Sequence, residues 1–366
     1  MAGCKIFLTG FPGFIGRWLV REILEKVQGC EFTFLVVDSF VGQARREIET
    51  LHASPTGKDA KMEVLTGDIT RPWLGLDEKA YHELAARITD VFHLAAIYDL
   101  HVHEDVAYRV NVDGTRNIVD FCAETKGLKA LVYFSTCYVA GRRTGTILED
   151  ELIAGTGFKN HYESTKFEAE RIVREKMDRI PSIIIRPGIT VGHSKTGETQ
   201  KFDGPYFGMV LIDKLKLLQL PLPYLGPSEA EVNLVPIDYV VGGTVAIWRK
   251  GGTTGKCYAM ADPNPVTART VYAEIIRLLG ARGPWGQIPP VLIDLPLQLL
   301  PVRQLLEVPG EVLEYFNHAT HFDTKNAVAA LEGTGVKCPH ILEYMPTLVA
   351  FFQANKHRSE YRWKPF

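Results

Sequence analysis

Six short runs of β-branched and aromatic residues in the first half of the chain alternate with longer segments of mixed polarity. Continuous apolar runs of this length are typical of strands that are buried on both faces of a sheet. The runs are KIFLTG near residue 5, FTFLVVD near 32, MEVLTGD near 62, DVFHLAA near 90, ALVYFST near 130 and SIIIRPG near 182.

The intervening segments have the periodicity of amphipathic helices. Residues 17–27, 105–124 and 164–177 carry apolar side chains three and four positions apart, with charged side chains between them. This alternation predicts parallel strands joined by right-handed crossovers, with helices on both faces. The predicted fold class is therefore α/β, a doubly wound parallel sheet whose ligand lies beyond the carboxyl ends of the strands.

After Gly188 the character of the chain changes. Glycine, proline and charged residues dominate HSKTGETQKFDGPYF, and prolines interrupt the later apolar runs. We expect the sheet domain to span residues 1–190 and a smaller, mostly C-terminal lobe to follow it. Within this lobe, residues 289–310 are strongly apolar, but prolines at 296 and 301 exclude one membrane-spanning helix. We interpret this stretch first as packed helices, second as the lining of an apolar substrate pocket and third as a contact with a membrane surface.

The charge balance of the chain bears on its possible partners, and the first residues bear on its cellular location. The chain has 41 basic and 43 acidic residues, so no net field would attract nucleic acid. Its start, MAGCKIFLTG, lacks the basic region and long apolar stretch of a signal peptide or membrane anchor, so we expect a cytoplasmic protein.

The six cysteines lie far apart, without metal-ligand spacing, and we expect reduced, buried thiols. His101 and His103 are interpreted as loop residues, because no further ligand lies near them in the sequence. No metal is predicted.

The first strand leads directly into TGFPGFIGRWLV, a glycine-rich segment with a helical pattern that starts near Phe14. Gly10 suits a tight turn with positive φ, Gly13 allows close approach of a pyrophosphate, and Gly16 allows close packing of helix and strand. The amino terminus of the helix would add a favourable dipole. We therefore predict a dinucleotide site, with a purely structural turn as the alternative. The residues expected to contact the dinucleotide are Gly10, Pro12, Gly13, Phe14, Ile15 and Gly16.

The end of the second run places Asp38 where a carboxylate can accept both hydroxyls of an adenosine ribose. A 2′-phosphate would be repelled there, so NAD is favoured. Arg45 and Arg46 could balance that charge and keep NADP open.

The third and fourth runs end in further candidate contacts. Asp68 and Ile69 would cover the adenine edge, although Asp68 is equally well explained as a turn residue. Ala95 and Ala96 are small enough for close backbone approach.

Tyr162 and Lys166 share one face at the start of the last predicted helix of the sheet domain. An ammonium at ~5 Å in an effective dielectric of ~20 would favour the phenolate by ~3 kcal/mol, although burial of the phenol would oppose this. Tyr162 is interpreted as proton donor in reduction or acceptor in oxidation, and Lys166 as its tuning charge and a ribose ligand. Thr136 would bind the reacting oxygen, since alternation along a strand points only one of Ser135 and Thr136 into the cleft.

Together, TGFPGFIG, FHLAA, NVDGT, FSTCYV, YESTK and RPGITVG resemble the extended short-chain dehydrogenase/reductase superfamily, which includes NAD-dependent epimerases and dehydratases. GDITRPWLGL, HLAAIYDL and RPGITVGHSKTGET resemble its fatty acyl-CoA reductase and thioester reductase branch. The resemblance covers nearly the whole chain.

This resemblance implies a Rossmann-type NAD(P)-binding domain in which Thr136, Tyr162 and Lys166 are catalytic. It further implies that residues 232–260 return to that domain, and that residues 191–231 and 261–366 form the substrate-binding lobe. The carboxamide of the cofactor would be held by Pro187, Gly188 and Ile189.

This chain departs in two ways from the fatty acyl-CoA reductase and thioester reductase branch, and these differences limit how far the properties of that branch can be assigned to it. Members of that branch commonly carry arginine where this chain has Asp38. The chain also shows no adenylation or carrier segment, so we expect its substrate to arrive free or separately carried. A homodimer through two long helices is a further family-level expectation.

The leading hypothesis is hydride transfer to or from a carbonyl or alcohol carbon of an apolar substrate, such as an acyl thioester, a fatty aldehyde or a hydroxysteroid-like alcohol. A nucleotide-sugar epimerase with retained NAD is the first alternative. Cys137 and Tyr138 disfavour a dehydratase, because they replace its acidic pair. The presence of Tyr162 and Lys166 disfavours a non-catalytic dinucleotide-binding sensor.

Overall fold

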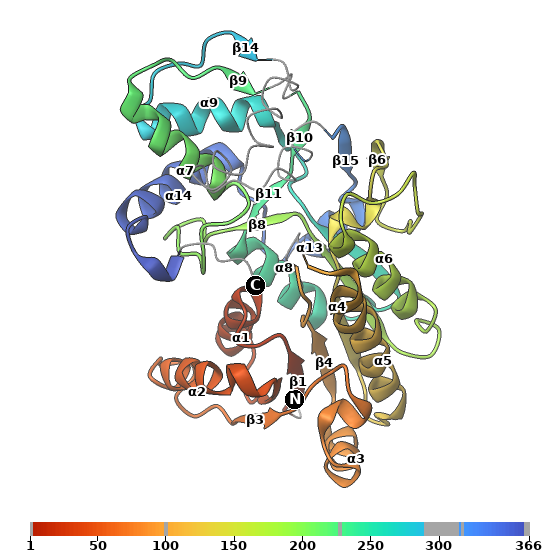
Figure 1. The fold of residues 1–366 in the computed structure, drawn as a ribbon. Coiled ribbons are helices and arrows are strands. Elements are labelled where there is room, and N and C mark those ends of the chain that lie inside the picture. Colours follow the sequence, from red (N-terminus) through yellow and green to blue (C-terminus); the bar gives the residue numbers. More distant parts are fainter. Residues whose placement is uncertain (1–2, 99–101, 226–228, 289–314, 316–317, 362–366) are drawn as a thin grey trace.

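A seven-stranded parallel sheet, in the order β12-β7-β5-β4-β1-β2-β3, forms the centre of the larger domain (Figure 1). The computed structural model describes residues 3–98, 102–225, 229–288, 315 and 318–361. All six predicted strands are present, and β12 is the seventh. The fold is the predicted α/β, Rossmann-type, doubly wound sheet.

The described elements have the following bounds. The strands of the large sheet are β1 (Lys5–Thr9), β2 (Glu31–Val36), β3 (Met62–Thr66), β4 (Asp90–His93), β5 (Ala130–Phe134), β7 (Ser182–Pro187) and β12 (Lys256–Met260). Shorter strands pair two by two: β6 (Gly145–Ile147) with β15 (Thr320–Phe322), β8 (Ile189–Val191) with β11 (Leu234–Pro236), β9 (Tyr224–Leu225) with β14 (Gln287–Ile288), and β10 (Glu231–Val232) with β13 (Val266–Thr267). The helices are α1 (Phe14–Lys26), α2 (Asp38–His52), α3 (Glu78–Arg87), α4 (Glu104–Tyr108), α5 (Gly114–Glu124), α6 (His161–Arg174), α7 (Tyr206–Leu215), α8 (Ile237–Arg249), α9 (Ala268–Leu279), α13 (Lys325–Leu331) and α14 (Ile341–Asn355). Single helical turns are η1 (Pro72–Gly75), η2 (Arg109–Asp113), η3 (Cys137–Ala140), η4 (Lys216–Leu218) and η5 (Ser359–Tyr361).

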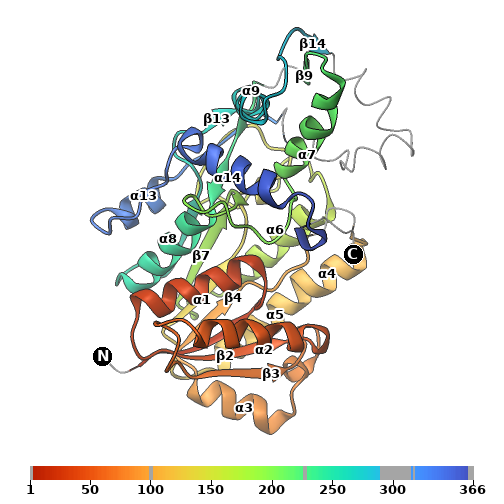
Figure 2. The same cartoon turned by 90° about the vertical axis from the view of Figure 1, so that its left-hand side faces the viewer.

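Helices cover both faces of the sheet, because successive side chains of each strand point to opposite sides. In β1, Ile6 and Leu8 pack with residues of α1, α2 and α8, whereas Phe7 packs with residues of α3, α5 and α6. Figure 2 shows α8, α1 and α2 in a row on the first face. Both faces of the inner strands are therefore buried, which explains runs such as that of β1. The edge strand β3 has no fully buried residue.

A smaller lobe packs α7, α9 and α14 around a separate apolar core, seen above the sheet in Figure 1. Phe202, Tyr206 and Phe352 are among its buried aromatic residues. The apolar stretch at 289–310 lies outside the described residues, and so does His101. Among the described helices, none combines the length and apolar composition needed to cross a lipid bilayer.

The register of β1 and β2 brings two cysteines together. Lys5 lies opposite Glu31, so Cys4 and Cys30, one position earlier, are neighbours, and they form a disulfide with Cα atoms 4.6 Å apart. The expectation of reduced thiols is therefore wrong for this pair. Strand pairing joins these residues across 26 positions of sequence, and cysteine spacing alone does not reveal such a contact. The other four cysteines are free.

Candidate active site

The glycine positions of the loop between β1 and α1 have no room for a side chain. Gly10 has a φ of 88°, and a Cβ there would lie 2.8 Å from the Ala95 nitrogen. A Cβ on Gly13 or on Gly16 would lie 2.8 Å from the Gly10 oxygen. No side chain caps the amino terminus of α1, so the first turn, which includes Phe14, presents its N–H groups and positive dipole end. This cradle has the shape and dipole that suit a pyrophosphate, and the cofactor contacts of the loop, which also contains Pro12 and Ile15, stay a prediction.

The end of β4 closes against this loop. The Ala95 N–H donates to Thr9 Oγ1 at 3.2 Å, which fixes the backbone leading to Ala96 beside the glycine turn. The small side chains at these two positions therefore lie where close backbone approach to a ligand is expected.

Asp38 lies at the same edge of the sheet, but it does not end a strand. β2 ends at Val36, and Asp38 is the exposed first residue of α2. The apolar run extends past the strand because Val37, although apolar, already caps the helix. An acidic residue in the first turn also stabilises a helix, so the ribose contact of Asp38 stays a prediction.

Asp68 takes part in a turn after β3. Its Oδ1 accepts hydrogen bonds from the Thr70 backbone N–H at 2.9 Å and from Thr70 Oγ1 at 2.8 Å. Ile69 is buried, and its carbonyl accepts a hydrogen bond from Asn117 Nδ2 at 2.7 Å. These contacts give both residues a structural role, and their adenine contact stays a prediction.

Tyr162 and Thr136 come together at the carboxyl end of β5. Tyr162 lies in the first turn of α6, whose cap Asn160 accepts the Glu163 N–H at 3.0 Å. Burial raises the pKa of Tyr162 to about 12, although its hydrogen bond with Thr136 acts in the opposite direction. Ser135 points elsewhere, donating to Glu170 Oε2 at 2.6 Å. The Ser135 hydroxyl is therefore occupied by Glu170, and Thr136 is the residue that meets the Tyr162 hydroxyl just beyond the end of β5.

Lys166 lies one turn further along α6 and is 3% exposed. Its Nζ donates to Tyr133 Oη at 2.9 Å and to the Phe134 carbonyl at 2.6 Å. Burial lowers the pKa of Lys166 to about 7, against the opposing charge of Glu170. The expected lowering of the Tyr162 pKa is therefore wrong for the structure as it stands, because burial of the phenol outweighs the other influences on it.

The segment from Pro187 to Ile189 leaves the sheet beside these groups. β7 ends at Pro187, and β8 begins at Ile189. A Cβ on Gly188 would lie 2.7 Å from Asn233 Oδ1, so glycine is required for this close packing. The carboxamide contact of the three residues stays a prediction.

Asn111 is a site residue that the sequence interpretation missed. Its Nδ2 donates to the Ile97 carbonyl and to Thr165 Oγ1, both at 3.0 Å, and its Oδ1 accepts the Ile97 N–H at 2.9 Å. Asn111 thus ties the loop after β4 to α6. It lies in η2, a π-helical turn between α4 and α5, where a single helix was expected. The motif NVDGT, used above only for the resemblance, is the signal that could have indicated it.

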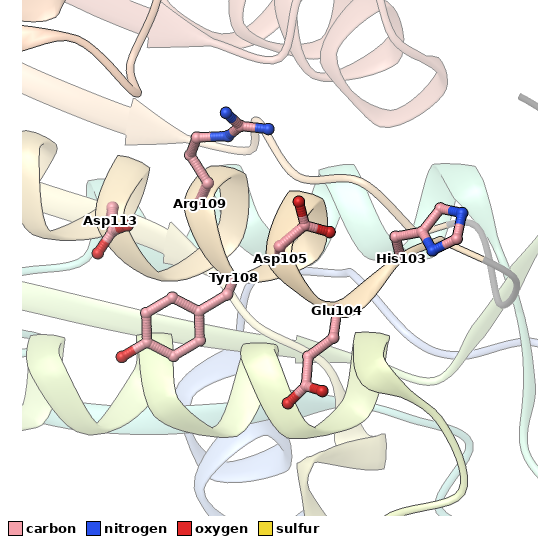
Figure 3. A pocket seen from close by; sticks show the side chains of 6 residues that line it. All are labelled: His103, Glu104, Asp105, Tyr108, Arg109 and Asp113. Atoms are coloured by element: carbon pink, nitrogen blue, oxygen red, sulfur yellow. The ribbon is translucent and has the colours of Figure 1, made fainter.

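The open hollow in Figure 3 is not the site described above. It is lined by residues of α4 and η2 and by the residue that caps α4, with Arg109 on the opposite side of the helix from Tyr108. None of the predicted cofactor or catalytic residues lines it. Within the residues that the structure describes, no group of three or more His, Cys, Asp or Glu side chains could hold a metal.

An NAD-binding family model, described as male sterility protein, matches residues 8–244. The chain belongs to this family. Among its relatives, the non-canonical nonribosomal peptide synthetase FrzA of Cladobotryum sp is 30% identical over 274 residues, which cover 71% of this chain and 26% of that protein. The fatty acyl-CoA reductase wat of Drosophila melanogaster is 24% identical over 277 residues, which cover 66% of this chain and 53% of that protein. The chain therefore matches between about a quarter and a half of these proteins.

Solved structures show the same fold. The terminal R domain from the myxalamid PKS-NRPS biosynthetic pathway matches with a TM-score of 0.82 and 24% identity, covering 98% of this chain and 93% of that one. The UDP-glucuronic acid 4-epimerase from Bacillus cereus, solved with NAD, matches with a TM-score of 0.66 and 18% identity, covering 96% and 99%. The male sterility family member described here thus has the fold of the extended short-chain dehydrogenases/reductases.

Proposed function

We propose that this chain is an NAD(P)-dependent reductase that transfers hydride to the carbonyl carbon of an apolar acyl thioester or fatty aldehyde. The observation that carries the proposal is the meeting of Thr136 with Tyr162, one turn before Lys166, at the sheet edge that also holds the glycine cradle. Reductases among the relatives, including a fatty acyl-CoA reductase and an aldehyde reductase, support the reaction class.

When bound at this site, a reduced nicotinamide would supply the hydride for the carbonyl carbon. Thr136 orients the carbonyl oxygen, and Tyr162 gives that oxygen its phenolic proton. An aldehyde then becomes an alcohol. A thioester first gives a hemithioacetal; its hydroxyl proton returns to the Tyr162 phenolate as the C–S bond breaks, which releases the aldehyde, and the leaving thiolate takes a proton from water to become a free thiol. Lys166 would hold the ribose of the cofactor.

The protonation state of Tyr162 is compatible with a role as proton donor in reduction. With a pKa of about 12, the phenol keeps its proton near neutral pH, which is the form that a reduction needs. Oxidation needs a phenolate, and burial disfavours that charged form.

We propose that residues 191–231 and 261–366 supply the substrate-binding surface, and that residues 1–190, with 232–260, bind the cofactor. The apolar core shared by α7, α9 and α14 supports a separate lobe, and β12 pairs with β7 in the large sheet.

The proposal is tested by mixing the purified protein with NADH or NADPH and either a long-chain acyl-CoA or a long-chain aldehyde. We expect absorbance of the reduced nicotinamide to fall, with aldehyde or alcohol formed in matching amount. No turnover across such a panel would contradict the proposal. Tightly retained NAD combined with no net turnover would instead indicate an epimerase.

Asp38 is proposed to select NAD, and replacing it tests the choice of cofactor. Asp38→Asn removes the charge that would repel a 2′-phosphate, so we expect the kcat/KM ratio of NADPH to NADH to rise about tenfold. Asp178→Asn removes an exposed charge beyond the end of α6 and serves as the control. An unchanged ratio in Asp38→Asn would show that this carboxylate does not face the ribose.

A further inference from the structure

A buried chain of hydrogen bonds runs from the glycine loop to the catalytic lysine. Thr9 Oγ1 lies 2.7 Å from His93 Nδ1, and His93 Nε2 lies 3.0 Å from Thr115 Oγ1. Thr115 also lies within hydrogen-bonding reach of the Tyr133 hydroxyl, which accepts from Lys166 Nζ at 2.9 Å. All five side chains are at most 3% exposed. The mechanism above uses only the last of them.

The direction of each bond follows from its neighbours. Thr115 Oγ1 donates to the Asn111 carbonyl at 2.6 Å, so it accepts from His93 Nε2–H. His93 Nδ1 must then accept from Thr9, whose oxygen already accepts the Ala95 N–H. Burial lowers the pKa of His93 to about 3, so the imidazole is neutral and has one N–H to donate.

Tyr133 is the junction between this chain and Lys166. Its oxygen accepts from the ammonium, so its proton is available to Thr115, whose oxygen can accept two hydrogen bonds. The Tyr133 ring also lies against the ammonium, with Nζ 4.5 Å from the ring centroid. The Phe134 carbonyl holds a second N–H of the same group. The hydroxyl of Tyr133 is therefore the one side-chain hydrogen-bond acceptor that the described structure gives to Lys166.

We propose that Tyr133 is a positioning residue for Lys166: its hydroxyl, fixed by Thr115 and His93, holds the Lys166 ammonium in place and stabilises its charged form. The role rests on the proposed function, in which Lys166 binds the ribose of the cofactor. Because the same chain ends at Thr9 and Ala95, it joins the wall of the cofactor site to the lysine in one rigid network.

Several charged or titratable groups face Lys166 besides Tyr133. Glu170 lies one turn further along α6 and favours the ammonium. Positive charge on Lys166 in turn disfavours protonation of His93, which approaches from β4. Glu170 is itself paired with Arg186 from β7. With these groups unchanged, loss of the Tyr133 hydroxyl removes one acceptor from the ammonium, so the pKa of Lys166 falls.

The experiment compares Tyr133→Phe with the wild type by following the side-chain 15N resonance of Lys166 against pH, assigned by its loss in Lys166→Arg. A hydrogen bond to a charged group is strong enough for us to expect a titration midpoint about one pH unit lower. Thr115→Val, which removes the next bond in the chain, should shift it in the same direction by a smaller amount. Tyr81→Phe removes a buried hydroxyl on α3 and should leave the midpoint unchanged.

The activity profile gives a second readout. Since the ammonium is the working form of Lys166, the alkaline limb of kcat should move to lower pH by the same amount in Tyr133→Phe, and not in Tyr81→Phe. An unmoved Lys166 midpoint in both Tyr133→Phe and Thr115→Val, with the folded spectrum retained, would overturn the positioning role. Absence of turnover in the wild type would contradict the proposed function instead, and the 15N titration would still decide the role of Tyr133.

Discussion

Tyr162→Phe is expected to lower kcat about 10³-fold with a long-chain aldehyde or acyl-CoA, because the ring stays in place while the proton donor is lost. The hydrogen bond between Tyr162 and Thr136 is lost as well. The affinity for NAD(P)H should change little, since the glycine cradle and Lys166 are untouched. The two measurements are the rate of reduced-nicotinamide oxidation and a cofactor titration by fluorescence.

Tyr258→Phe provides the matched control for this substitution. Tyr258 lies on β12, is buried, and donates to the Thr253 carbonyl at 2.9 Å, remote from the glycine loop in the strand order. Its loss should reduce stability without changing kcat. If Tyr162→Phe kept more than about a tenth of the activity, the phenol would not be the proton donor.

Glu170→Gln is expected to destabilise the fold by about 3–5 kcal/mol, because it breaks a buried ionic cluster on one side only. Glu170 is fully buried and Arg186 is 2% exposed. The carboxylate accepts from Arg186 at 2.7 and 3.0 Å, from Arg174 at 2.7 Å and from Ser135 at 2.6 Å. The glutamine leaves the buried guanidinium uncompensated. Urea unfolding followed by circular dichroism measures the loss.

Glu168→Gln on the same helix provides the control, since the Glu168–Arg171 pair is exposed and should contribute less than about 1 kcal/mol. The pH dependence of unfolding gives an independent check. Burial raises the pKa of Glu170, but Arg186 and the other donors outweigh it and the pKa is lowered. The contribution of Glu170 is therefore present above its unfolded pKa and lost as pH falls through the folded value. A Glu170→Gln protein with unchanged stability and acid dependence would show that the cluster does not contribute.

The strands and the glycine loop were predictable because local pattern determines them. Ile6, Phe7 and Leu8 are all apolar since each face of β1 is covered, and a buried parallel strand shows this in its sequence. The loop geometry follows from positions such as Gly10, where a side chain would meet the backbone just beyond the end of β4.

The polar interior could not be predicted in the same way. His93 and Tyr133 lie within apolar runs, and their meeting through Thr115 depends on how β4, β5 and α5 pack. The charge state of Lys166 likewise depends on burial and on Glu170. The spacing of residues along the chain showed which side chains share one face of α6. Their pKa values could not be inferred in this way, because these depend on neighbours that only the three-dimensional structure brings close.

The π-helical turn around Asn111 carries one more residue than an α-helical turn would. Each residue of an α-helix adds about 100° of rotation about the helix axis. Removing one residue between Arg109 and Asp113 would therefore rotate α4, and the side chains before the deletion, by about that angle relative to α5. Asn111 could then no longer face both Ile97 and Thr165 while the apolar side of α5 stayed on the sheet. The length of this segment is therefore constrained as tightly as its composition. A related sequence could substitute many side chains here more easily than it could delete one residue.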